Sequence, residues 1–312
     1  MWRFMQGVGG RENMKGCGAK TLVRMAARRV AWGMTLFLLT ALTMLAFAAN
    51  SILNRMAVWD AGMDPLAFAV IRVAAGAVVL AALVWRRVGR LPDYAPSRRW
   101  KGVASLGLYM VGFSLAYLTL DAGIGALILF GGVQITMFAA SVMARESVPP
   151  LRWLGAVVAM AGLVYLLWPR GAVSVDAGGA VLMAGAALGW GIYSILGRGA
   201  ADALEGTAAN FGLLLPVMVL PALVAEWALS PVAQALAVTS GAVTSGLGYA
   251  LWYRVLPQMA GATAAIAQLS VPVIAVAAGA VLLGEPVTRE LIVAAALVLG
   301  GIGISTFAGR RG

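Results

Sequence analysis

Long apolar segments, separated by short polar or Pro- and Gly-containing breaks, dominate the pattern along the chain. A helix needs about 20 apolar residues to cross the hydrocarbon core of a bilayer, and each segment approaches that length. The longest connection, residues 86–101, is basic and too short to form a soluble domain. We therefore predict ten membrane-spanning helices, at residues 33–54, 64–85, 102–120, 122–144, 151–168, 177–197, 207–229, 231–253, 258–283 and 288–308.

Two of these segments carry a local signal for the start of a helix. Asp64-Pro65 opens the second segment, and Ser230-Pro231 opens the eighth. Asp and Ser side chains cap free backbone N–H groups, and proline is favoured at the first helical position because it lacks the N–H that would need a partner. Both dipeptides predict helix starts at these positions.

The composition agrees with a membrane environment. Of the 312 residues, 62% are hydrophobic and 11% are charged, whereas a soluble globular chain has about 45–50% apolar and about 25% charged residues. A soluble core cannot accommodate this excess, but lipid can solvate apolar side chains on the outside of the protein as well. We predict an all-α integral membrane protein.

The distribution of charge tests the number of spans. If the N-terminus is cytoplasmic and the spans alternate, 19 of the 23 Lys and Arg residues fall on the cytoplasmic side. This bias follows the positive-inside rule and predicts that both termini are cytoplasmic. The net charge of +11 is then explained by topology, and we expect no nucleic-acid partner.

The N-terminal region allows a second interpretation. Basic residues at Arg24–Arg29, an apolar run and the sequence Ala46-Phe47-Ala48 resemble a secretory signal with its cleavage site. An internal repeat argues against cleavage, because the matching stretch continues beyond that point. We interpret residues 1–32 as a basic cytoplasmic tail; its first 30 residues also fit an upstream start codon.

Several short matches indicate an internal repeat. Residues Asn50–Arg55 and Tyr193–Arg198 agree at four of six positions with an offset of 143. Glu146-Ser147-Val148 matches Glu285-Pro286-Val287 with an offset of 139, a spacing that also pairs Gly162 with Gly301. We predict two five-helix units, at residues 33–169 and 177–308. An odd number of spans inverts the second unit, and inverted repeats are the architecture of alternating-access transporters.

The same motifs resemble the EamA-type family of the drug/metabolite transporter superfamily. The resemblance covers residues 34–308 and rests on Trp190-Gly191-Ile192-Tyr193, Ser270-Val271-Pro272 and Gly284-Glu285. It implies metabolite transport across the bacterial inner (plasma) membrane, commonly export of amino acids, with the aromatic and neutral amino-acid exporters as the favoured subgroup. Two departures weaken the transfer of a substrate from relatives: Gly131-Gly132-Val133 stands where the second unit has its proline, and Phe47 stands where it has Trp190.

Polar groups inside the predicted spans are candidates for substrate contact, because such groups usually face a cavity or another helix. Asn50 and Asn54 are four residues apart, so they share one helix face. Gln134 and Gln268 lie within spans four and nine. For all four, hydrogen bonding between helices is the alternative role. Arg72, within span two, could receive a carboxylate, pair with another helix or extend to the membrane interface.

Aromatic residues on spans three, six and eight form a second candidate group, whose alternative role is packing or placement at the membrane interface. A cavity with aromatic walls and a few polar groups would suit apolar amino acids. The predicted aromatic members of the substrate site are Tyr109, Trp190, Tyr193 and Tyr249.

Glycine and proline mark possible points of movement. Pro272 is expected to break span nine and free backbone carbonyls, and Gly131 and Gly132 are expected to let span four bend. We interpret these three residues as gating or hinge positions, with kinked packing as the alternative. Gly300, Gly301 and Gly303 permit close helix approach, within a monomer or in a homodimer.

Several chemistries are disfavoured by what the sequence lacks. The chain has one cysteine and no histidine, no phosphate-binding G-x-x-x-x-G-K-[ST] loop, and no carboxylate clearly at a midplane position. We expect no metal, no cofactor and no enzymatic activity, and we expect exchange or facilitated diffusion of a small molecule, an amino acid above all, in contact with membrane lipid. A carrier of drugs, nucleosides or sugars remains an alternative; a membrane enzyme or a structural membrane protein is a remoter one.

Overall fold

The computed structural model describes residues 19–145, 148–168, 175–198, 200–227, 230–259 and 261–308. Within these ranges the chain forms helices and no strands. Residues 1–18 of the predicted tail and Glu146-Ser147 of the repeat motif lie outside the described residues.

The described helices follow the predicted segments closely. The fourth, fifth, sixth, ninth and tenth predicted segments each correspond to one helix, within about three residues at each end. The elements are α1 (Ala19–Arg55), η2 (Met56–Asp60), α2 (Pro65–Val88), α3 (Pro96–Ala116), α4 (Ala122–Met143), α5 (Pro150–Leu167), α6 (Ala177–Arg198), α7 (Ala203–Val217), α8 (Val219–Val224), α9 (Pro231–Thr239), η3 (Ser240–Leu247), α10 (Gly248–Val255), η4 (Leu256–Gln258), α11 (Gly261–Leu282) and α12 (Arg289–Ala308).

Both predicted helix starts are confirmed by their hydrogen bonds. The Asp64 carboxylate accepts hydrogen bonds from the backbone N–H groups of Leu66 and Ala67 at 2.8 and 3.0 Å, so α2 begins at Pro65. The Ser230 hydroxyl accepts one from the N–H of Ala233 at 3.1 Å at the start of α9. Each cap satisfies donors that the first turn of a helix leaves free.

Several helices differ from the predicted segments in their ends or their continuity; α3, for example, runs from Pro96 to Ala116 where residues 102–120 were predicted. The helix predicted to begin at residue 33 begins at Ala19, because the basic segment before it continues the helix. The seventh segment is divided into α7 and α8 just after Pro216, whose ring clashes with the preceding turn. In contrast, α11 runs through Pro272 without interruption, so the expected break of this span is wrong; a helix packed among others tolerates the missing N–H.

Five of the described helical stretches are long and apolar enough to cross a bilayer: Gly33–Asp60, Pro65–Val88, Ala122–Met143, Pro150–Leu167 and Ala177–Gly197. The eighth predicted segment is not one continuous α-helix, because it consists of α9, the π-helix η3 and α10 in succession.

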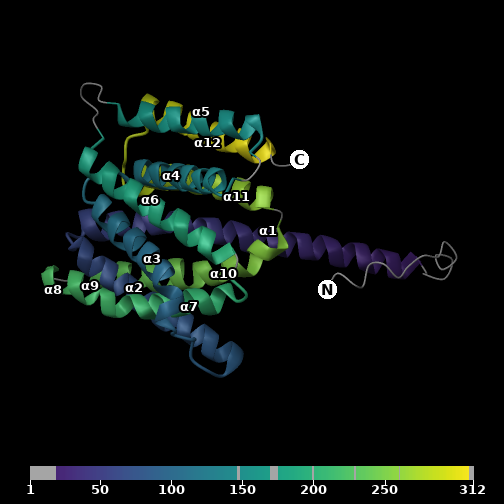
Figure 1. Cartoon of the computed structure of the whole chain (residues 1–312), viewed down its shortest axis with the longest axis horizontal. Helices are drawn as coiled ribbons and strands as arrows, with labels where there is room; N and C mark the ends of the chain where they lie inside the picture. Colours follow the sequence, from purple (N-terminus) through teal and green to yellow (C-terminus); the bar gives the residue numbers. More distant parts are fainter. Residues whose placement is uncertain are drawn as a thin grey trace.

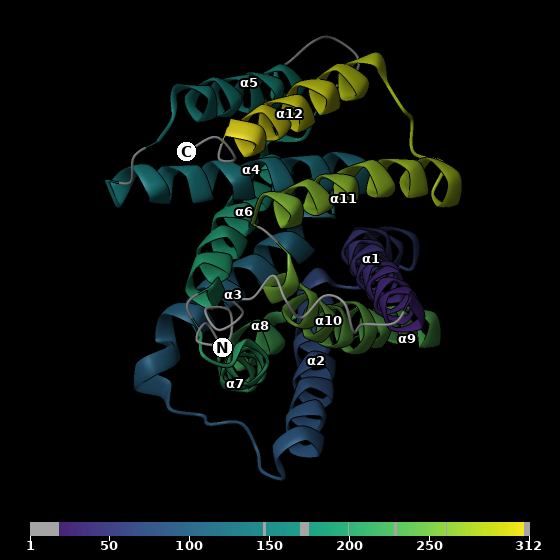
Figure 2. The same cartoon turned by 90° about the vertical axis from the view of Figure 1, so that its right-hand side faces the viewer.

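The helices are arranged in layers (Figure 1). Helix α5 packs along α12 at one edge of the molecule, and α4 packs along α11 beneath them. Below these lie α6 and α3, followed by α1, α2, α7 and the α9–α10 segment. Figure 2 shows the same order of helices from the side. The N-terminal part of α1 extends away from the other helices (Figure 1).

The α5–α12 contact depends on two glycines. A Cβ atom on Gly301 would lie 2.5 Å from the backbone oxygen of Gly155, and a Cβ on Gly155 would lie 2.4 Å from the backbone oxygen of Gly301. Real Cβ atoms do not approach backbone oxygen so closely, and small residues allow this separation in membrane helices. The two helices therefore touch backbone to backbone.

The distribution of polarity is opposite to that of a soluble protein. Large apolar side chains are exposed along the outer helices, for example Val157 on α5 and Val181 on α6. Polar side chains lie inside, including Asn50, Ser51, Asn54, Arg72, Ser105, Ser114, Thr207, Ser240, Thr244 and Ser245. An apolar surface of this extent requires an apolar surrounding, so the internal polar residues define where a functional site can lie.

Candidate functional site

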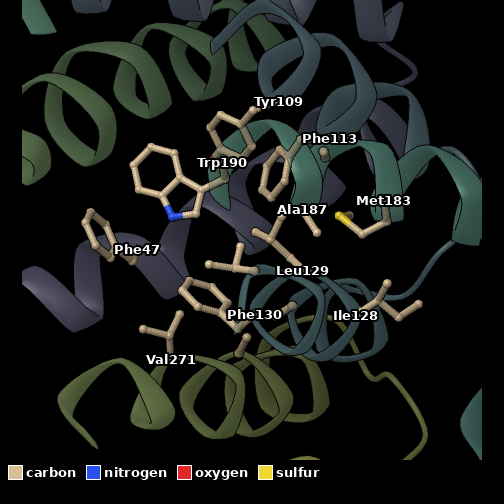
Figure 3. Close-up of a cluster of buried hydrophobic side chains, with 14 of the residues drawn as sticks. Phe47, Tyr109, Phe113, Ile128, Leu129, Phe130, Met183, Ala187, Trp190 and Val271 are labelled. Carbon is tan, nitrogen blue, oxygen red and sulfur yellow. The ribbon is translucent and has the colours of Figure 1, made fainter. Parts of the chain in front are cut away.

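Trp190 of α6 is the centre of a buried aromatic cluster. Its ring centroid lies 5.0 Å from that of Tyr249 on α10 and 5.1 Å from that of Tyr109 on α3. Tyr193, one turn further along α6, is stacked against it at 5.7 Å, and Phe47 of α1 meets it edge-on at 6.3 Å. Figure 3 shows Trp190 between Tyr109 and Phe47. Three helices thus bring the four predicted aromatic residues together, and α1 adds Phe47.

A cavity of about 510 Å³ opens beside Trp190. Its volume falls within the range of about 300–1,000 Å³ that is usual for small-molecule sites. Gln134 of α4 and Gln268 of α11 both line it, and their contact with substrate stays a prediction. The other residues with polar side-chain atoms that line it are Ser141, Arg152, Ser194, Trp252, Tyr253 and Ser305.

The remaining predicted site residues do not line this cavity. Tyr109, Tyr249, Asn50 and Asn54 are buried outside it. Tyr193 lines a second, smaller hollow of about 190 Å³ beside α7. Trp190 is the predicted residue that belongs to both groups, because it lines the cavity and contacts Tyr109 and Tyr249. It therefore connects the wall of the cavity with the buried aromatic cluster.

Asn50 accepts a set of hydrogen bonds from η3. Its Oδ1 accepts one from the Thr244 hydroxyl at 2.5 Å, one from Ser240 at 2.9 Å and a long one from Ser245 at 3.5 Å. A π-helix is rare and often occurs at functional sites. Here it presents three hydroxyls toward one amide, and sequence reasoning missed these residues because no local signal distinguishes a π-helix from an α-helix.

Asn54 binds a different helix. Its Nδ2 donates to the Ser114 hydroxyl of α3 at 3.3 Å, while its buried Oδ1 has no hydrogen-bond partner. Both asparagines are buried, as expected for one shared helix face, and each joins α1 to another helix. The observed contacts match the alternative role of hydrogen bonding between helices, and substrate contact stays a prediction.

Arg72 of α2 is fully buried, so it does not extend to the membrane interface. Its Nε donates to the Ser245 hydroxyl at 3.0 Å, and its Nη2 donates to the Tyr109 hydroxyl at 2.9 Å. Its guanidinium carbon lies 4.9 Å from the ring centroid of Phe113 and 5.3 Å from that of Tyr109. Nη1 has no partner. Arg72 thus pairs with neighbouring helices through neutral groups.

The N-terminal end of α4, opposite to the half that lines the cavity, is held by charged groups. Glu285, in the connection between α11 and α12, accepts hydrogen bonds from the N–H of Ala122 at 2.6 Å and of Gly123 at 3.2 Å. Arg55 of α1 donates to the Tyr117 carbonyl at 3.0 Å and forms an ion pair with Asp121 at 3.4 Å. The cavity residues of α4 lie in its C-terminal half, so these contacts close the other end of the protein.

Burial raises the pKa of Glu285 above its ordinary value, and the nearby Asp121 adds to this, while the N–H groups of Ala122 and Gly123 act in the opposite direction. The folded protein therefore binds the proton more tightly than the unfolded chain does. The stabilising contribution of the protonated group is complete below the ordinary glutamate pKa and is lost as pH rises through the raised value.

We expect Glu285→Gln to remove this part of the pH dependence, because glutamine cannot ionise. The midpoint of thermal unfolding in detergent, measured from pH 4 to pH 8, should fall less steeply with pH in the variant than in the wild type. Glu290→Gln, in the first turn of α12, controls for the loss of one negative charge. Parallel curves for wild type and Glu285→Gln would contradict the prediction.

The predicted hinge residues of α4 lie at a helix contact. A Cβ atom on Gly132 would lie 2.7 Å from the Cβ of Ala187 on α6, and one on Gly131 would lie 3.1 Å from Val298 of α12. Helix α4 is continuous through both glycines. They are explained here by close packing, and their role as a hinge stays a prediction, as does that of Pro272.

The apolar exterior, the buried polar residues and the five long apolar helices define a multi-pass helical membrane protein. Residues 177–307 match the EamA-like transporter family. A related sequence, Uncharacterized protein PA1977 of Pseudomonas aeruginosa, is 44% identical over 269 residues, which cover 86% of this chain and 93% of that protein. The match of residues 177–307 to the EamA-like transporter family supports a place for the chain in the drug/metabolite transporter superfamily.

A solved structure described as "Crystal structure of protein" has the same fold. Its TM-score against this chain is 0.61 at 21% sequence identity, and the match covers 89% of this chain and 98% of the other. This likeness concerns the arrangement of helices over almost the whole of that chain.

Proposed function

We propose that the protein is a secondary transporter that exchanges or exports small metabolites, with aromatic or neutral amino acids as its substrates. The observation that carries this proposal is the cavity beside Trp190, which combines an aromatic wall with the amide groups of Gln134 and Gln268. Amides can hydrogen-bond the amino and carboxylate groups of an amino acid, and aromatic rings accommodate an apolar side chain. The match to the EamA-like transporter family supports transport as the activity.

The proposed architecture is ten spans in two inverted units, residues 33–169 and 177–308. The helix contacts support it, because the main contacts between the units have counterparts after the units are exchanged; the contact of α4 with α12 is an exception. In the second unit, α6 corresponds to α1, α10 to α3 and α11 to α4. The contact of α3 with α6 therefore corresponds to that of α10 with α1, and the contact of α4 with α6 corresponds to that of α11 with α1. Three pairs are their own counterparts: α2 with α7, α4 with α11 and α5 with α12.

The pair Phe47 and Trp190, which are 143 residues apart in the sequence, adds to this argument. Phe47 and Trp190 occupy equivalent positions in the two units, and their rings meet at 6.3 Å. Equivalent residues meet only near the axis that relates two units. The proposed mechanism is alternating access about this point, since one sequence pattern in two orientations gives inward-open and outward-open states of similar energy.

The placement of basic residues supports an orientation with both termini in the cytoplasm of a bacterial cell, within the inner membrane. The cavity then opens toward the cytoplasm, and the contacts of Glu285 and Arg55 close the outer side. Substrate, lipid and, in a homodimer, a second copy are the partners of this proposal. Nothing in it requires a cofactor.

The test is exchange in proteoliposomes that are preloaded with unlabelled amino acids and supplied with radiolabelled ones outside. We expect uptake above that of protein-free liposomes for aromatic and neutral amino acids, with competition among them. Absence of uptake across all amino acids, with protein that elutes as a folded species, would contradict the proposal. The same liposomes loaded with nucleosides, sugars or cationic drugs would then identify which alternative cargo is carried.

A further inference from the structure

We propose that Arg72 binds a carboxylate of the transported substrate through its free Nη1, while the aromatic cluster around Trp190 receives the rest of the molecule. This inference rests on the proposed transport function and assigns the group that the substrate must carry. Arg72 is fully buried inside the protein, and its Nη1 has no hydrogen-bond partner.

The charge of Arg72 is not neutralised by the residues around it. Among the described residues, the acidic side chains that form ion pairs are Asp121, Asp202 and Glu205, and their partners are other arginines. The groups that contact Arg72 are two hydroxyls and two aromatic rings, which are all formally neutral. A buried cation normally has a counter-ion. A substrate carboxylate would supply one.

The donor geometry of Arg72 also suits a carboxylate. Nε and Nη2 are held by Ser245 and Tyr109, which fixes the plane of the guanidinium. Ser245 in turn donates to Asn50, so the arginine is anchored to α1 and η3 as well as to α3. A guanidinium fixed in this way presents its remaining N–H groups without further loss of side-chain freedom.

A route from the cavity to Arg72 passes through two aromatic side chains. Trp190 lines the cavity, its ring packs on Tyr109 at 5.1 Å, and the Tyr109 hydroxyl bonds Arg72. A substrate reaches the guanidinium when Trp190 and Tyr109 separate. The carboxylate then lies at Arg72, and an aromatic side chain takes the place that the two rings vacate.

The first experiment measures binding by thermal unfolding of purified protein in detergent. The probes are L-phenylalanine, 3-phenylpropionate, which lacks the amine, and phenethylamine, which lacks the carboxylate. We expect the two carboxylates to stabilise the wild type and phenethylamine to have no effect. In Arg72→Gln the apparent affinity for both carboxylates should fall about ten- to a hundredfold, the loss typical of one charge-assisted hydrogen-bonded contact.

Two further variants keep the test decisive. Arg86→Gln, at the exposed end of the same helix, should bind as the wild type does. Arg72→Lys keeps the charge and loses the planar fork, so it should retain part of the affinity. It is the variant to measure if Arg72→Gln fails to fold. Equal stabilisation by phenethylamine and 3-phenylpropionate, or unchanged affinity in a folded Arg72 variant, would overturn the inference.

Transport separates this inference from the function on which it rests. If wild-type proteoliposomes exchange no amino acid, the proposed function fails, while the binding measurement still decides the role of Arg72. A second outcome is that wild-type proteoliposomes exchange phenylalanine, and that unlabelled phenylalanine and phenethylamine inhibit this exchange equally in the wild type and in the Arg72 variants. In that case transport stands and the carboxylate site is disproved.

Discussion

Replacing Trp190 by alanine is expected to reduce amino-acid exchange at least about tenfold while the protein still folds. The ring contacts four other aromatic rings and lines the cavity, and each aromatic pair contributes about 0.5–1.5 kcal/mol beyond its buried area. Loss of these contacts removes one wall of the site. Initial rates of phenylalanine exchange in proteoliposomes, at matched protein content, give the measurement.

Two variants control this experiment. Trp168→Ala removes the same side chain at the end of α5, where Trp168 is 62% exposed, so its exchange rate should equal that of the wild type. Trp190→Phe keeps a ring and should retain part of the rate. Wild-type kinetics in Trp190→Ala would show that this residue lies outside the substrate route.

Gly301→Val is expected to destabilise the protein by about 3 kcal/mol, the upper part of the usual range for overpacking. The new Cβ would lie 2.5 Å from the backbone N of Ala159 and from the backbone oxygen of Gly155, and backbone atoms cannot move aside as a side chain can. Helices α5 and α12 would have to separate along their length. Thermal unfolding in detergent, followed by size-exclusion chromatography of the heated samples, reports the loss.

Gly303→Val is the matched control, because a Cβ on Gly303 meets no atom within 4 Å. It adds the same branched side chain to the same helix, two residues further on, and should leave the unfolding midpoint within a few degrees of the wild type. A similar loss in both variants would attribute the effect to valine in α12 and not to the α5–α12 contact.

Local signals were sufficient for much of the helical framework. Asp64-Pro65 predicted the start of α2 to the residue because the capping bonds involve only neighbours in sequence. The apolar segments predicted where helices run, because length and hydropathy are properties of a single stretch of chain. The same reasoning missed the continuity of α11 through Pro272, which depends on how the surrounding helices pack.

The candidate site was only partly predictable for the same reason. Gln134, Gln268 and Trp190 were found because polar or large aromatic residues inside spans are conspicuous, and the cavity brings them together. Ser240, Thr244 and Ser245 were missed, since their importance comes from a π-helix and from Asn50, which lies about 190 residues earlier in the sequence. The burial of Arg72 likewise follows from long-range packing.

The pairing of Phe47 with Trp190 has an energetic consequence for the proposed transport cycle. If the two units exchange conformations, Phe47 takes up the surroundings of Trp190, and Trp190 takes up those of Phe47. Because the two rings differ in size, the two end states cannot be packed equally well. The difference contributes to which state predominates in the absence of substrate. Exchanging these two residues would shift that preference while leaving the summed volume of the two side chains unchanged.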